Sequence, residues 1–174
     1  MTLAGLEEGS AVFIDANVFI YHFVGASPEC TALLRRCETG EVHGSTSALV
    51  LAEVSHRLMM IEAVERKLVA AGNVARKLAR RPDVVRQLAV HEASIQAIPA
   101  MQIEITSVTE ATIPLSLRHQ RRYGLLTNDS LIVASMQRSP VSRDCRSASG
   151  DRGRDRGPRS GGSEPVINLV ARTR

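Results

Sequence analysis

Two short segments about 110 residues apart each place an aspartate where an apolar element ends or begins. Asp15 directly follows the apolar run at residues 11–14, and Asp129 stands just before the apolar run at residues 131–134. Glu53 lies between them in sequence, inside an otherwise apolar stretch. A carboxylate in apolar surroundings is costly unless it is paired or bound to a metal ion. The three positions therefore predict one shared divalent cation.

Each carboxylate also has a purely structural alternative. Asp15 could cap the helix that follows it, and Asp129 could be an ordinary first-turn acid at a helix N-terminus. Glu53 could form an ion pair with Arg57, one helical turn further on. The occurrence of all three acids in apolar settings favours the shared site.

The chain is predicted to alternate strands and helices. Short apolar or alternating runs at residues 11–14, 41–46 and 100–108 are typical of β-strands. Helices are predicted at residues 18–23, 28–38, 47–62, 63–80 with an interruption at Gly72 and Asn73, 82–97, 110–123 and 129–137. Thr127 or Asn128 is the predicted N-cap of the last helix.

This alternation indicates an α/β fold with a mostly parallel sheet. In such sheets ligands bind at the carboxyl ends of the strands, which is where Asp15 stands. Asp129 begins a helix, and Glu53 lies in the second turn of the helix that follows the second strand. All three positions are compatible with one site.

The charge of the chain changes abruptly after Arg138. Residues 1–138 contain 12 Arg and 2 Lys against 14 Asp and Glu, so they carry no net charge. Residues 139–174 contain 8 Arg against 4 acidic residues, so they carry the entire net charge of +4. This last segment is rich in Arg, Gly and Ser and too poor in apolar residues to order itself. We therefore predict one domain at residues 1–138 and an atypical, basic, disordered segment at 139–174.

Several classes of protein are disfavoured by what the sequence lacks. No stretch reaches the roughly 18 apolar residues of a membrane helix, and the N-terminus does not resemble a signal peptide, so a cytoplasmic protein is expected. Cys30, Cys37 and Cys145 lack the spacing of a zinc site or a disulfide framework. The absence of Walker A, GxGxxG and GxSxG motifs leaves nucleotide binding and serine hydrolysis unsupported.

Carboxylate ligands point to a hard cation. Mg²⁺ and Mn²⁺ prefer oxygen ligands, and Mg²⁺ usually retains several bound waters. Such an ion lowers the pKa of a bound water and stabilises negative charge on a phosphate. Hydrolysis of a phosphate ester therefore requires no Ser, His or Cys nucleophile.

Three motifs resemble those of the PIN-domain family. Residues 13–21, Phe-Ile-Asp-Ala-Asn-Val-Phe-Ile-Tyr, are similar to its opening motif, and residues 52–54, Ala-Glu-Val, to its second. Residues 125–134, Leu-Leu-Thr-Asn-Asp-Ser-Leu-Ile-Val-Ala, resemble its third motif in the form found in VapC-type toxins. The resemblance covers residues 11–138.

The resemblance implies a three-layer α/β/α sandwich and an Mg²⁺- or Mn²⁺-dependent endoribonuclease that hydrolyses phosphodiester bonds of tRNA, rRNA or mRNA. It also implies the toxin of a type II toxin–antitoxin pair, often a homodimer that a small antitoxin protein inhibits. Asp15, Glu53 and Asp129 would be the catalytic, metal-binding residues. The supporting polar residues would be Asn17, Thr46, Ser47, Thr127 and Asn128.

The chain departs from the family after residue 138. The family continues with a strand, a fourth acidic residue and a last strand. Asp144, Asp151 and Asp155 lie at about the right distance, but none follows an apolar strand. Arg outnumbers Lys 20 to 2, as in a GC-rich gene, and we hypothesise a shift of the reading frame near Ser139. The last strands of the sheet would then be missing or disordered.

Two other functions remain open. A catalytically impaired PIN-like module would bind an antitoxin or RNA without cleaving, because a missing fourth acid weakens metal binding. A different Mg²⁺ phosphohydrolase is disfavoured, because such families usually have a second Asp where this chain has Asn17. Arg121 and Arg122 are RNA contacts in the nuclease interpretation and solvated helix-end residues otherwise.

The frame-shift hypothesis predicts a specific result at the level of the gene. Translation of the two other frames beyond Ser139 should yield a strand-like apolar run followed by an acidic residue. The absence of such a continuation from both frames would show that the hypothesis is wrong.

Overall fold

The computed structural model describes residues 3–139, within which three strands lie among mostly helical elements. The strands are β1 (Ala11–Phe13), β2 (His43–Ser47) and β3 (Glu104–Thr106). The α-helices are α1 (Ala16–Phe23), α2 (Pro28–Glu38), α3 (Ala48–Glu65), α4 (Val74–Leu78), α5 (Pro82–Val85), α6 (Val90–Ala97), α7 (Thr112–Tyr123) and α8 (Thr127–Arg138). Short 3-10 helices, η1 (Leu3–Gly5) and η2 (Ile98–Met101), precede β1 and β3. The predicted disordered segment, with Asp144, Asp151 and Asp155, lies outside the described residues.

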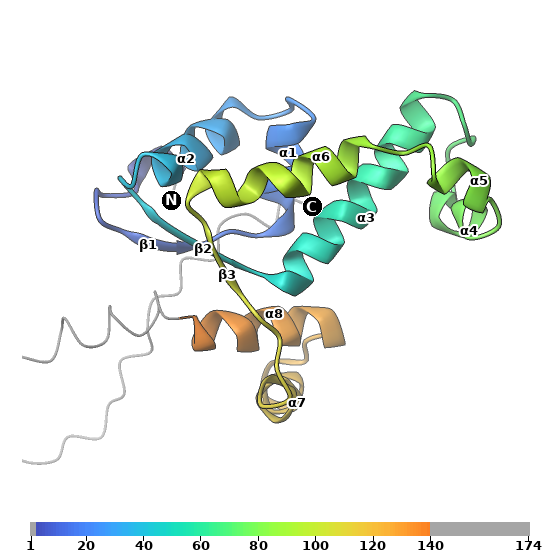
Figure 1. The fold of residues 1–174 in the computed structure, drawn as a ribbon. Coiled ribbons are helices and arrows are strands. Elements are labelled where there is room, and N and C mark those ends of the chain that lie inside the picture. The colour runs from blue at the N-terminus through green and yellow to red at the C-terminus, as the bar shows by residue number, and fades with distance from the viewer. Residues whose placement is uncertain (1–2, 140–174) are drawn as a thin grey trace, which may run out of the picture.

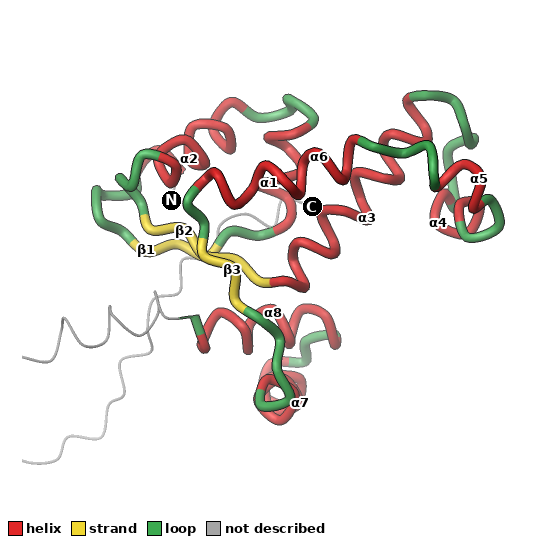
Figure 2. Tube along the Cα trace, in the orientation of Figure 1, coloured by secondary structure: helices red, strands yellow, loops and turns green. Residues whose placement is uncertain are grey.

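The three strands form one parallel sheet in the order β1-β2-β3 (Figure 2). Phe13 pairs with Ser45 across the first ladder, and Ser47 pairs with Thr106 across the second. The strands therefore end at the same edge of the sheet. Within residues 3–139, β1 and β3 each keep one unpaired edge.

Helices cover both faces of this sheet (Figure 1). On one face lie α1, α2, α3 and α6, where α2 packs on β2 and α3 packs on both α1 and α6. On the other face α8 packs on β2, and α7 packs on α8. This arrangement confirms the predicted α/β/α sandwich. In the described part of the chain, no helix is long and apolar enough to cross a membrane.

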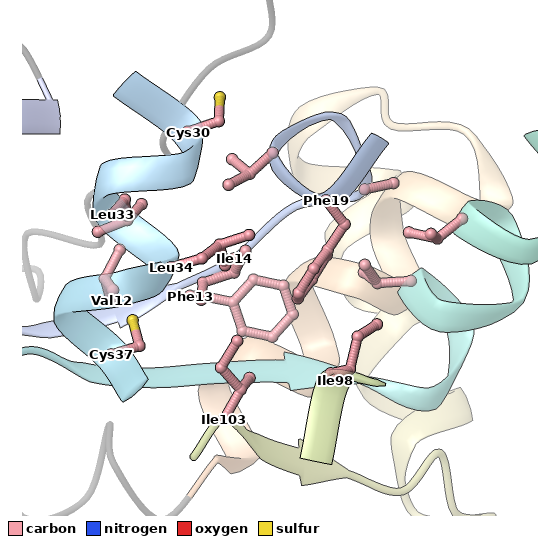
Figure 3. Close-up of a cluster of buried hydrophobic side chains, with 14 of the residues drawn as sticks. Val12, Phe13, Ile14, Phe19, Cys30, Leu33, Leu34, Cys37, Ile98 and Ile103 are labelled. Carbon is pink, nitrogen blue, oxygen red and sulfur yellow. The ribbon is translucent and has the colours of Figure 1, made fainter. Parts of the chain in front are cut away.

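Most of the larger core cluster lies between the sheet and the helices around α1 and α2 (Figure 3), and α8 contributes Ile132 and Met136 to it. Ile14, Phe19 and Val54 are completely buried there. Because Gly44 of β2 has no side chain, Cys37 and Ile14 can pack directly against the strand. A Cβ atom at this position would lie 2.9 Å from Sγ of Cys37 and 3.0 Å from Cδ1 of Ile14. Burial raises the pKa of the Cys37 thiol to about 11. The thiol therefore stays protonated and packs as a small apolar group.

The region between α3 and α6 is less helical than predicted. A helix is predicted at residues 63–80. In the structure, residues 63–65 are the end of α3, and α4 is the one other helix in this range. The predicted interruption at Gly72 and Asn73 begins earlier, at Lys67, whose φ of 57° is left-handed. A right-handed helix cannot continue through such a residue.

Two predicted boundaries are also wrong. α8 has Leu126 at its N-cap position and no side-chain cap, so neither Thr127 nor Asn128 has the predicted capping role. The predicted strand at 100–108 is reduced to β3, because the chain before it turns through η2 and through Gln102, whose φ is 54°.

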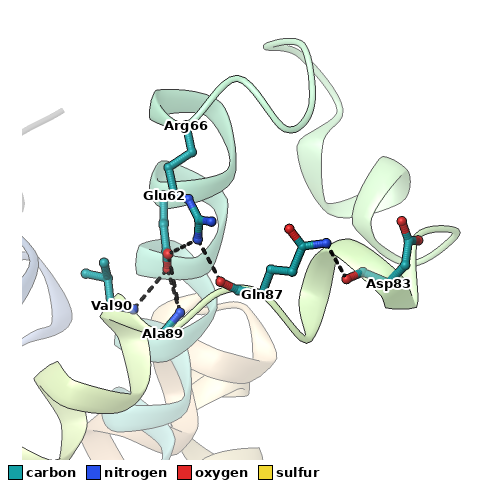
Figure 4. Close-up of polar contacts among 6 residues, drawn as sticks. All are labelled: Glu62, Arg66, Asp83, Gln87, Ala89 and Val90. Atoms are coloured by element: carbon teal, nitrogen blue, oxygen red, sulfur yellow. Dashed lines mark hydrogen bonds and ion pairs between the residues drawn. The ribbon is translucent and has the colours of Figure 1, made fainter.

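A buried carboxylate explains why the predicted helix at 82–97 is divided into α5 and α6 (Figure 4). Glu62 of α3 is 5% exposed and accepts hydrogen bonds from the backbone N–H groups of Ala89, at 3.1 Å, and Val90, at 3.0 Å. Such groups at a helix N-terminus have no partner within their own helix. Nη1 of Arg66 lies 2.8 Å from Oε1 of Glu62. Glu62 thus caps α6 from a distant part of the chain.

We expect Glu62→Gln to lower the free energy of unfolding at pH 7 by about 1–3 kcal/mol, because an amide places a donor among groups that already donate. Burial opposes ionisation, but the hydrogen bonds from Arg66, Val90 and Ala89 hold the pKa of the Glu62 carboxyl below its ordinary value. The stabilisation is therefore complete above the unfolded pKa of about 4.3 and is lost as the pH falls through the lower folded pKa.

Urea unfolding at pH 7 and at acidic pH measures this difference. Glu65→Gln is the matched control, since Glu65 is an exposed acid on the same helix, and it should change the stability by less than about 0.5 kcal/mol. Equal stabilities of the wild-type protein and the Glu62→Gln variant at pH 7 would contradict the capping role.

Candidate active site

Asp15 stands just beyond the end of β1, at the N-cap position of α1. Its backbone is extended, with φ −82° and ψ 163°, but its side chain does not cap the helix. The carboxylate is partly buried and forms no hydrogen bond or ion pair with residues 3–139. The capping alternative is therefore wrong, and the carboxylate is available to a cation.

Glu53 lies in the second turn of α3 and is partly buried. Nε of Arg57 is 3.8 Å from its Oε1 atom, and the side chains of Glu53 and Arg57 are 40% and 51% exposed. The alternative ion pair is therefore present, but an exposed pair at this distance contributes little to stability. Glu53 can exchange this contact for a cation at small energetic cost.

Asp129 lies in the first turn of α8, where the helix dipole favours an acid. Its side chain is partly buried, whereas those of Thr127 and Asn128 are exposed at the same helix end. The carbonyl oxygen of Thr127 accepts a hydrogen bond from the hydroxyl of Ser130 at 2.8 Å. This end of α8 thus presents one acid and two exposed polar side chains.

The helices associated with the three acids pack on one another. α1 packs against α3, and α3 packs against α8. Figure 1 shows that all three helices begin near the end of the sheet at which the strands terminate. Among residues 3–139, however, no three Asp, Glu, His or Cys side chains are close enough to hold one metal ion. The described site is a convergence of three acidic positions and not a closed ligand cluster.

Comparison with known proteins identifies the family. The family model for the PIN domain matches residues 12–143, a range that includes all three predicted motifs. The chain belongs to the PIN-domain family. No curated protein and no solved structure matches it. PIN domains are in general nucleases that act on nucleic acid and use divalent metal ions.

Two of the predicted supporting residues have structural roles in this PIN domain. Thr46 is fully buried, and its Oγ1 donates a hydrogen bond of 2.9 Å to the carbonyl oxygen of Ile14, the residue before Asp15. Ser47 is also fully buried, and its Oγ caps α3 by accepting the N–H of Val50 at 3.3 Å. The two hydroxyls therefore fix the backbone beside Asp15 and the beginning of α3.

Asn17 borders a pocket that the sequence analysis missed. The pocket has a volume of about 760 Å³, lies between α1 and α3, and is also lined by Tyr21, Arg57 and Ile61. It adjoins the candidate site, since Arg57 also contacts Glu53. Asn17 and Tyr21, like Arg57 and Ile61, are four residues apart on one helix face, but this spacing within each helix could not show that the two helices pack together.

Arg121 and Arg122 are exposed in the last turn of α7. Residues 124–126 join this turn to α8, so both arginines lie close in sequence to the helix end that carries Asp129. Arg118, which the sequence analysis also missed, is exposed one turn earlier on the same helix face. Arg118, Arg121 and Arg122 stand at positions i, i+3 and i+4. This helical spacing is the sequence signal that could have added Arg118 to the other two arginines.

We expect Thr46→Val to lower the free energy of unfolding by about 1 kcal/mol, because valine has a similar shape but cannot donate to the Ile14 carbonyl. Thr39→Val is the matched control, since Oγ1 of the exposed Thr39 makes a comparable bond of 3.2 Å to the carbonyl oxygen of Arg36. Urea unfolding followed by circular dichroism compares them. A loss at Thr46 no larger than the loss at Thr39 would refute the proposed tie between β2 and the Asp15 backbone.

Proposed function

We propose that this PIN domain is an Mg²⁺- or Mn²⁺-dependent endoribonuclease, the cytoplasmic toxin of a type II toxin–antitoxin pair, that acts as a homodimer on tRNA, rRNA or mRNA. Asp15 carries the proposal, because it is a partly buried carboxylate with no partner among residues 3–139 and it lies where α/β folds bind ligands. Family membership supports action on nucleic acid. The likeness of residues 125–134 to the VapC-type motif supports RNA and the toxin role.

The carboxylate chemistry of the three acidic positions fits a hard divalent cation. Asp15, Glu53 and Asp129 would hold the ion, since all three offer carboxylate oxygens and Glu53 has only a weak competing partner. When bound, the ion would supply an activated water and a counter-charge for the phosphate.

The remaining site residues position these acids and the substrate. The Thr46 hydroxyl holds the backbone next to Asp15, and the Ser47 cap holds the beginning of α3. Arg121 and Arg122 would attract the phosphate backbone of RNA. The side chains of Asn17, Thr127 and Asn128 would form hydrogen bonds to the substrate or to ligands of the ion.

One observation favours a second function. Because the described part of the chain does not bring three potential metal ligands together, the alternative is a catalytically impaired module that binds an antitoxin or RNA without cleaving it. The two functions differ in whether Asp144, Asp151 or Asp155 supplies a further acid to the site.

Cleavage of a mixed tRNA and rRNA pool by the full chain, with Mn²⁺, Mg²⁺ or EDTA, tests the proposal. We expect cleavage only with metal and a loss of about 100-fold or more in Asp15→Asn, because an amide neither carries the charge nor binds the ion comparably. Asp83→Asn is the matched control, since Asp83 is an exposed aspartate of α5.

The outcomes separate the two functions. Metal-dependent cleavage that is lost in Asp15→Asn and retained in Asp83→Asn would support the nuclease. A folded wild-type protein that binds RNA but does not cleave it with either metal would refute the nuclease and support the binding module.

A further inference from the structure

An exposed tyrosine lies at the end of α7, beside the candidate site. Tyr123 is 51% exposed. The buried residues of α7 are Thr112, Ser116 and His119, and Tyr123 continues this stripe by one more turn. Because a short loop joins α7 to α8 and the two helices pack on each other, the end of α7 adjoins the beginning of α8. Tyr123 therefore stands near the helix end that carries Asp129.

The Tyr123 ring is supported by its neighbours. The ring of His119 stacks with it, with 5.7 Å between the centroids and an interplanar angle of 20°. Cζ of Arg122 lies over the ring, 5.1 Å from the centroid. His119 is itself 6% exposed, and its Nε2 is 3.2 Å from Oε1 of Gln137 on α8. The orientation of the ring is thus set by the helix pair before any ligand binds.

Positive charge accompanies this aromatic ring. Arg118, Arg121 and Arg122 are all exposed on α7, and the sequence between Glu110 and Asp129 contains no acidic residue. Proteins that bind single-stranded nucleic acid combine cations that follow the phosphates with aromatic rings on which bases stack. The face of α7 next to Asp129 provides both.

We propose that Tyr123 is a stacking platform for one base of a single-stranded RNA segment, which takes the place over the ring that the exposed Arg122 guanidinium holds in the free protein, while Arg118 and Arg121 contact the neighbouring phosphates. This inference rests on the proposed action on RNA and adds the way in which the strand is held. Stacking on a fixed ring would position the RNA backbone across the beginning of α8, where Asp129 lies.

Fluorescence anisotropy of the full chain in EDTA tests the platform with two labelled probes, a short oligoadenylate and an abasic oligoribonucleotide of equal length. We expect the wild-type protein to bind oligoadenylate about ten-fold or more tightly than the abasic probe, because stacking requires a base. Tyr123→Leu retains an apolar contact for His119 but has no aromatic face, so it should remove this preference. Tyr123→Phe should preserve it.

Two arginine variants separate stacking from charge. Arg118→Gln should weaken the binding of both probes by the same factor, because phosphates are present in both. Arg80→Gln is the matched control, since Arg80 is an exposed arginine outside α7 and α8, and it should change neither affinity by as large a factor.

Equal binding of both probes by the wild-type protein would overturn the proposal and leave this face of α7 to an acidic protein partner. An unchanged preference in Tyr123→Leu would overturn it as well. The wild-type comparison can still overturn the proposal if that variant does not fold. Because binding is measured in EDTA, a failure of the nuclease proposal, seen as no cleavage with metal, is distinguished from a failure of the platform.

Discussion

The parallel pairing of β1 with β2 is the interaction on which the candidate site depends. It brings Asp15 and the beginning of α3 to the same edge of the sheet. Two short bonds join the strands beside the site: the N–H of Ile14 donates to the carbonyl of Ser45 at 2.7 Å, and the Thr46 hydroxyl donates to the carbonyl of Ile14 at 2.9 Å. These bonds are buried, where loss of a partner is expensive. The position of Asp15 therefore follows from a buried, doubly hydrogen-bonded part of the fold.

The α/β architecture was predictable wherever local and tertiary signals agree. Residues 11–14 are apolar, β-branched in part and buried, so both strand propensity and burial lead to β1. The beginning of α2 is determined locally, since Oγ of Ser27 accepts the N–H of Cys30 at 3.3 Å and Pro28 follows the cap. The motif around Asp15 could likewise be recognised because its residues are contiguous.

The features that could not be predicted depend on residues far apart in the sequence. Glu62 caps Ala89 from 27 residues away, and no periodicity within 82–97 reveals that its helix must break there. The pocket beside Asn17 exists only because α1 and α3 pack together. Sequence motifs can name Asp15, Glu53 and Asp129, but the separation of their carboxylates is a product of helix packing. The motifs alone therefore could not show that residues 3–139 fall short of a closed ligand cluster.

The attachment of α7 has a consequence for the same site. Its buried side chains are polar: Thr112, Ser116 and His119. Ile113 and Leu117 of this helix are instead 46% and 51% exposed, so burial of apolar area contributes little to its attachment. Hydrogen bonds to α8, such as Nε2 of Gln120 to Oγ of Ser130 at 3.1 Å, contribute only about 1 kcal/mol each. Elements with few buried apolar contacts are displaced at lower free energy than a core helix. A ligand that binds α7 in its packed position would therefore stabilise that position by mass action, and with it the helix end that carries Asp129.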